Sequence, residues 1–150
     1  MFYFEQVTHF ALGISTGNLF QIEDHEPLSL KAFWRHSLYS ASLSRKISDA
    51  TSGENRLDSS VAYLAGLMHN FGLLLFAHMF PAEFQLLNRW MALNPRTPIE
   101  VFERRLLGMG RASQILAGGH AKLGAWLMDY WGMPEEIITV AREHHHPNYQ

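Results

Sequence analysis

Histidine is the residue type in this sequence that could do chemistry. The 150 residues include nine histidines and no cysteine. A neutral imidazole binds zinc and other transition metals, and it also takes up protons near neutral pH. Because the chain has no thiol, disulfide frameworks and thiolate metal sites are excluded. The positions of the histidines decide whether an imidazole site can form.

Five of these histidines stand in or beside apolar segments with helical spacing. They are His36, His69, His120, His144 and His145. His69, for example, shares a predicted helix face with Gly66 and Leu73, one turn to either side. A bundle that turned such faces together would gather the imidazoles at one spot, as metal-binding helix bundles do. A single histidine of this kind is more often hydrogen-bonded or solvated than a ligand, but the set on separate helices favours a shared pocket.

The most apolar stretch of the chain, Ala62–Phe76, carries His69 and Asn70 in its middle. Burying such polar side chains costs roughly 1–3 kcal/mol each unless they find partners. Gly66 and Gly72 flank the pair, and a glycine inside a helix costs about 1 kcal/mol relative to alanine. These penalties indicate either a hydrogen-bonded core histidine or a functional site.

The elements that would position these histidines are all predicted to be helices. Apolar periodicity, prolines and capping residues place them at residues 1–12, 14–22, 29–50, 58–77, 81–93, 97–108, 120–131 and 134–146. Asp58 and Thr97 are predicted N-caps, and Pro81 and Pro98 suit first turns. Residues 108–119 contain four glycines and fit no single element. No alternating strand pattern occurs, so the predicted fold class is all-α.

Composition excludes several classes of function. Apolar residues make up 47% of the chain and charged residues 17%, and the net charge is −2, which argues against nucleic-acid binding. The longest apolar run, residues 61–80, is interrupted by His69, Asn70 and His78, so no membrane span is expected. The N-terminus has no basic region typical of a secretory signal. A cytoplasmic location is therefore expected.

Five short runs of sequence, taken in order, carry a family resemblance. They are FWRHS at 33–37, AGLMHNFG at 65–72, HAKLGAWL at 120–127, WGMPE at 131–135 and HHHP at 144–147. The first two resemble the HD superfamily, and the set is similar to the HDOD family, the HD-related output domain of bacterial signalling proteins. The resemblance implies an HD-domain-like helical bundle of about six to eight helices. Residues 1–150 would form a single domain with a divergent N-terminal segment (1–28) and an HD-like core (29–147).

The same resemblance relates the chain to metal-dependent phosphohydrolases and cyclic-dinucleotide phosphodiesterases. In those enzymes histidines and a His-Asp pair hold divalent metals that activate water, whereas HDOD members generally lack a complete ligand set and act as regulatory modules. Where the enzymes have His-Asp, this chain has His69-Asn70. Asparagine offers a neutral carbonyl where a hard cation prefers a carboxylate. The chain thus looks like a divergent or truncated HDOD domain without catalytic activity.

Two expectations about function follow. The first is a non-catalytic bacterial signalling output domain that acts through contacts with a signalling protein or a second copy, as in a homodimer. It would have no cofactor and a degenerate pocket lined by His36, His69, Asn70, His120, His144 and His145. The alternative is a phosphohydrolase or cyclic-dinucleotide phosphodiesterase with a divalent transition metal on His36, His69, His120 and His144, or a nucleotide-sensing domain. The His144–His146 run could also bind metal adventitiously.

Overall fold

The protein is all-α throughout the residues that its computed structural model describes, which are 26–53, 56–106 and 118–146. The helices, in chain order, are α2 (Leu30–Ala50), α3 (Ser59–Met68), α4 (Phe71–Met79), α5 (Pro81–Leu93), α6 (Ile99–Leu106), α7 (Gly119–Tyr130) and α8 (Glu135–Glu143). The predicted fold class is confirmed. The helices predicted at residues 1–12 and 14–22 lie outside the described residues.

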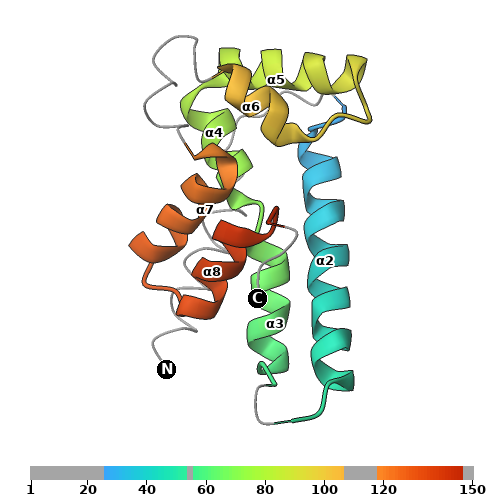
Figure 1. The fold of residues 1–150 in the computed structure, drawn as a ribbon, viewed down its shortest axis with the longest axis vertical. Helices are drawn as coiled ribbons and strands as arrows, with labels where there is room; N and C mark the ends of the chain where they lie inside the picture. Colours follow the sequence, from blue (N-terminus) through green and yellow to red (C-terminus); the bar gives the residue numbers. More distant parts are fainter. Residues whose placement is uncertain (1–25, 54–55, 107–117, 147–150) are drawn as a thin grey trace.

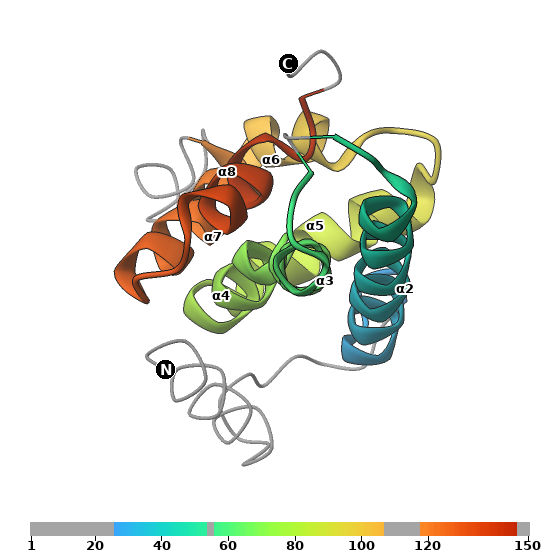
Figure 2. The ribbon, with the colours of Figure 1, turned by 90° about the horizontal axis from the view of Figure 1, so that it is seen from below.

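Helices α3 and α4 form the centre of the arrangement (Figures 1 and 2). The long helix α2 packs along α3, while α8 packs on the other side of α3 and α7 packs against α4. Helices α5 and α6 lie across the upper end of the bundle in Figure 1. The central position of α3 and α4 explains why this segment is the most apolar of the chain.

Local sequence signals account for most of the helix boundaries. The Ser29 side chain accepts a hydrogen bond from the Ala32 amide and caps α2. The Asp58 carboxylate accepts from the Ser60 and Val61 amides at 2.8 and 3.3 Å, so the predicted cap of α3 is confirmed. Pro81 begins α5 as predicted.

The prediction of one continuous helix over residues 58–77 is wrong at its centre. Helix α3 ends at Met68 and α4 begins at Phe71, with a turn at His69 and Asn70 between them. Asn70 has φ −99° and ψ 9°, outside the helical region, and the Leu73 amide donates to its carbonyl at 2.9 Å. The two polar residues therefore stand at a break between two helices, where a side chain can turn toward a site.

The two glycines of this segment bring helices into close contact. A Cβ atom on Gly66 would lie 2.8 Å from the backbone of Ser40 and Ala41 on α2. A Cβ atom on Gly72 would overlap the carbonyl oxygen of His120, at the start of α7. The helix-propensity penalty of both glycines is thus explained by packing. These approaches place His36, His69 and His120 on neighbouring elements.

Two apolar clusters build the core on either side of this point. One lies among α3, α4, α7 and α8 and includes Met68, Phe71, Met128 and Ile137. The other lies among α4, α5, α6 and α7 and includes Phe76, Leu87, Phe102, Leu106 and Leu123. Among the described residues, one helical stretch, Ser59–Met79, has the length and apolarity to cross a membrane. Because 61% of its most apolar window is buried by the other helices, it is accounted for as the core of the bundle.

Candidate functional site

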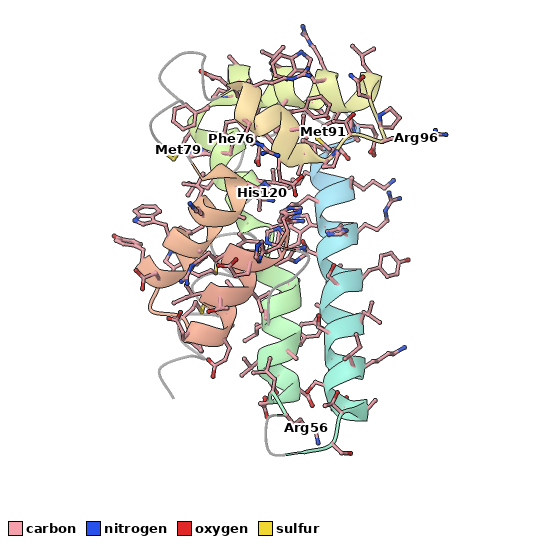
Figure 3. All side chains as sticks on the ribbon, viewed as in Figure 1. Arg56, Phe76, Met79, Met91, Arg96 and His120 are labelled. Carbon is pink, nitrogen blue, oxygen red and sulfur yellow. The ribbon has the colours of Figure 1, made fainter. Side chains whose placement is uncertain are left out.

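Five of the histidines that the structure describes meet at one place, near the middle of the bundle where Figure 3 labels His120. The Nε2 atoms of His36 and His69 lie 3.2 Å apart. The Nε2 atom of His120 lies 3.3 Å from that of His144 and 3.0 Å from that of His145. The rings of His69 and His144, whose centroids are 5.0 Å apart, join the two groups. All five histidines singled out from the sequence are therefore neighbours.

Main-chain carbonyls fix the outer nitrogens of two of these rings. His69 Nδ1 donates to the Gly66 carbonyl at 2.7 Å, and His144 Nδ1 donates to the Ala141 carbonyl at 2.9 Å. A carbonyl oxygen can only accept, so each Nδ1 carries the proton. In a neutral ring the Nε2 atom then presents a lone pair. Both lone pairs point into the cluster.

Two glutamates of α6 hold the rings of His120 and His145. Glu103 Oε1 accepts from His120 Nδ1 at 2.6 Å and from the His120 amide at 3.0 Å, and both side chains are buried. Glu100 Oε1 lies 2.6 Å from His145 Nδ1, where about a third of each side chain is exposed. Sequence reasoning missed both glutamates. The available signal was the position of Glu103, which shares a helix face with Ile99 and Leu106.

Burial sets the charge of the cluster. It lowers the pKa of His69 to about 4 and of His144 to about 3, and the neighbouring imidazoles add to both effects. Burial also lowers the pKa of His145. Burial alone would raise the pKa of Glu103, but the hydrogen bonds and charge of His120 bring it below the usual value. At neutral pH the cluster thus contains neutral His69 and His144 beside an ionised Glu103.

Asn70 lines a cavity of about 500 Å³ that also borders the cluster at His36, His120 and His145. The rest of the cavity wall is mostly apolar, with Phe33 and Phe84 among its residues. The Asn70 Oδ1 atom is buried and accepts no hydrogen bond from any described residue. This oxygen therefore makes no hydrogen bond with an imidazole of the cluster.

The donor set fits a transition metal better than a hard cation. His120, His144 and His145 each offer one ligand atom, and these atoms lie within 4.8 Å of one another. Three imidazoles, oriented through Nδ1 by carboxylates or carbonyls, are typical of zinc sites. Both glutamates that touch the cluster bind Nδ1 atoms at its outer side. The position next to His69, where a hard cation would need carboxylate oxygen, is held by the Asn70 amide.

The comparisons with known proteins agree with this geometry. The family model described as the HDOD domain matches residues 4–147. The chain belongs to the HDOD family. The match begins well before residue 33, where the resemblance in the sequence begins.

Two longer proteins each contain a region similar to this chain. A crystal structure of a candidate signal transduction protein from Marinobacter aquaeolei VT8 has a TM-score of 0.76 and 30% identity over 93% of this chain. An uncharacterized protein of Treponema pallidum (strain Nichols) is 26% identical over 132 residues, 88% of this chain. The chain spans 29% of the Marinobacter chain and 23% of the Treponema protein. It corresponds to about a quarter of each.

Proposed function

We propose that this HDOD domain is a non-catalytic signalling module that acts through protein contacts. The observation that carries the proposal is the position of the carboxylates. Glu103 and Glu100 are committed to Nδ1 atoms, and Asn70 stands where the related enzymes have aspartate. In the related enzymes a well-held metal activates the water that attacks the phosphodiester, and among the described residues His69 has no carboxylate beside it to help hold such a metal.

Two further observations support a role in signalling. The Marinobacter relative, which shares the fold over 93% of this chain, is named for signal transduction. Helix α2 also exposes a row of apolar side chains that the described residues leave in solvent: Tyr39 at 72%, Leu43 at 59% and Ile47 at 59%. Exposed apolar side chains that gather on one face are typical of protein contacts. We assign this α2 face as the contact surface for a signalling partner or a second copy.

A hydrolysis assay tests the catalytic half of the proposal. The chain, loaded in turn with Mn²⁺ and Zn²⁺, is incubated with cyclic dinucleotides and with a chromogenic phosphodiester. We expect no turnover above that of the metal-free chain. Turnover that disappears in His69→Ala and persists in His78→Gln, a histidine outside the cluster, would overturn the non-catalytic assignment.

Sedimentation velocity tests the contact surface. If two copies associate through α2, the double variant Leu43→Glu and Ile47→Glu sediments as a monomer at concentrations where the original chain is a dimer. The matched control is Trp126→Glu on α7, which is equally exposed but lies on another helix. If the control and the α2 variant dissociate alike, α2 is not the contact surface.

The second candidate function is a metal-dependent phosphohydrolase, and the convergence of imidazole nitrogens favours it. Its ligands would be those expected from the sequence, His36, His69, His120 and His144. His36 and His69 form a pair at 3.2 Å, whereas the tightest grouping of three is His120 with His144 and His145. The Mn²⁺ and Zn²⁺ assay above separates the two candidates.

A further inference from the structure

The cavity of about 500 Å³ that Asn70 lines is enclosed by side chains of α2, α4, α5 and α6. Helices α2 and α4 diverge above the break between α3 and α4, and α5 and α6 lie across the end of the bundle there (Figure 1). Met91 and His120, both labelled in Figure 3, belong to the cavity wall. Protein sites for small molecules typically have volumes of about 300–1,000 Å³. The cavity is therefore large enough for a small organic molecule.

Most of the cavity wall is apolar. Four helices contribute large apolar side chains to it, namely Phe33, Leu73, Phe84, Met91 and Ile99. Leu73 and Phe84 are only 8% and 6% exposed, so the cavity reaches the core of the bundle. Water in an apolar cavity finds few hydrogen-bond partners. An apolar group that took its place would gain the free energy of leaving water.

The polar groups of the wall stand beside the histidine cluster. Asn70 lines the cavity together with His36, His120 and His145. The Asn70 Oδ1 atom is buried and accepts no hydrogen bond from any described residue, and an unpaired buried acceptor is destabilising. The torsion that turns an asparagine amide is soft, so this oxygen can turn to meet a donor in the cavity. The acceptor therefore favours a ligand with a hydroxyl or N–H group.

The charges around the cavity argue against an anionic ligand. Among the described residues that line it, Arg35 has the one permanently charged side chain, and it is exposed. Behind His120 stands Glu103, whose pKa is lowered by its bonds with His120, so it is ionised at neutral pH. The phosphates of a nucleotide are usually bound by several cationic side chains. An uncharged ligand fits this wall better than a nucleotide does.

We propose that this cavity binds an uncharged small molecule that has an aromatic or branched apolar body and one hydroxyl or N–H donor for Asn70. The apolar body would lie against Phe33, Leu73 and Phe84, and the donor would bond to the Asn70 oxygen. The site goes beyond the proposed signalling function, because it gives the domain a ligand of its own that is neither a metal nor a nucleotide. The ligand would also contact α2, the helix that carries the exposed apolar face.

A packing defect is the competing explanation. An apolar cavity without any biological ligand still takes up apolar molecules of the right size. The two explanations differ in the role of Asn70, since a packing defect has no need of a hydrogen-bond donor. Only the proposed site prefers a molecule with a donor over the same molecule without one, and only while Asn70 is present.

The experiment uses the full chain and three uncharged probes with one donor each: phenol, indole and thymol. Each is compared with the derivative in which a methyl group replaces the donor hydrogen, which are anisole, N-methylindole and thymol methyl ether. Amide shifts in proton–nitrogen correlation NMR spectra measure binding. We expect at least one donor probe to shift the amides of the cavity wall and its methylated derivative to bind about 3–10-fold more weakly. Benzoate and AMP, which are anions, should not bind in the cavity.

Two variants and a matched control test the position of the probe. Asn70→Leu removes the acceptor, so the donor probe and its methylated derivative should bind equally well. Ala32→Phe places a ring in the cavity and should abolish binding, while Ala50→Phe, at an exposed position of the same helix, should leave it unchanged. Circular dichroism checks that each variant is folded, and Ala32→Phe serves if Asn70→Leu does not fold.

Each other outcome overturns the proposal. If no donor probe binds, or if binding survives Ala32→Phe, the cavity is not the site. Equal binding of donor probes and their methylated derivatives, or a preference for the donor that persists in Asn70→Leu, indicates a packing defect. Tighter binding of AMP than of every donor probe would replace the uncharged ligand with a nucleotide. The hydrolysis assay and the sedimentation of the α2 variants do not depend on these results, so the failure of the ligand site and that of the signalling function are distinguishable.

Discussion

The two halves of the histidine cluster differ in what stands behind the imidazoles. His36, which is exposed, and His69, which is held by a main-chain carbonyl, have no carboxylate partner among the described residues. His120 and His145 each have a glutamate at 2.6 Å. The half with His36 and His69, which carries the family's HD position, is thus poor in carboxylates. The half with His120, His144 and His145, built on α6, α7 and α8, is rich in them. This difference teaches that the positions of the histidines in the sequence do not show how the rings are held, because the glutamates behind two of them come from a separate helix, α6.

The largest effect is expected from removing the carboxylate of the rich half. Glu103→Ala leaves His120 Nδ1 and the His120 amide without an acceptor in a buried place, and breaking a buried pair costs about 3–5 kcal/mol. Glu103→Gln retains an oxygen that accepts from both donors and should cost about half as much or less. Urea unfolding of the metal-free chain measures both. Equal losses for the two variants would mean that the hydrogen bonds at Glu103 do not stabilise the fold.

The next largest loss of stability is expected from substituting Gly66 and Gly72, the glycines that bring α3 against α2 and α4 against α7. In Gly72→Ala the new methyl group overlaps the His120 carbonyl, and in Gly66→Ala it lies 2.8 Å from α2 backbone atoms. Overpacking of this kind costs about 1–3 kcal/mol, and we expect Gly72→Ala to be the more destabilising of the two. Thermal unfolding compares them. A smaller loss for Gly72→Ala than for Gly66→Ala would show that α4 and α7 separate easily.

Acid should weaken the cluster through His69, whose ring also contacts that of His144 in the other half. The pKa of His69 is about 4 in the folded chain and 6.5 ordinarily, so between these values the unfolded chain binds a proton that the folded chain does not. The stability is therefore complete above pH 6.5 and is lost as the pH falls toward 4. His69 alone accounts for about 2 kcal/mol between pH 7 and pH 5. Glu103, whose pKa is lowered from 4.5, stays ionised between pH 7 and pH 5 and so does not contribute to this loss.

Denaturant unfolding of the metal-free chain at pH 7 and pH 5 measures this loss. His69→Gln should lower the difference between the two pH values, while His78→Gln should leave it as it is. An unfolding free energy that is the same at both pH values would contradict the burial of neutral imidazoles.

The smallest effect is expected at the exposed end of the poor half. His36→Gln removes one contact, at 3.2 Å from His69, on a side chain that is already in solvent. A substitution of this kind usually changes stability by no more than about 0.5 kcal/mol. Urea unfolding of the metal-free chain measures this change. A loss as large as that of Glu103→Gln would show that His36 stabilises the cluster in spite of its exposure.

The sequence predicts the helices and the histidine positions because both rest on local patterns. Apolar spacing and the caps at Asp58 and Pro81 mark helices wherever the chain folds. The five histidines stand out because they interrupt apolar surroundings. Glu103 and Glu100 do not, since a glutamate in a helix is usually solvated, and only the packing of α6 against α7 shows that Glu103 is buried. The break at His69-Asn70 is also invisible in a run of apolar residues.

That break has a consequence for motion. Because α3 and α4 are separate hydrogen-bonded units joined at Asn70, the most buried segment of the bundle can open in two pieces. We expect amide hydrogen exchange to be faster at the junction, residues 69–71, than at the centres of either helix. Because α4 packs against α7 at His120, Glu103→Gln, which weakens the hold of α6 on His120, should make this exchange faster. The exchange rates of the core would then report how firmly α6 holds His120.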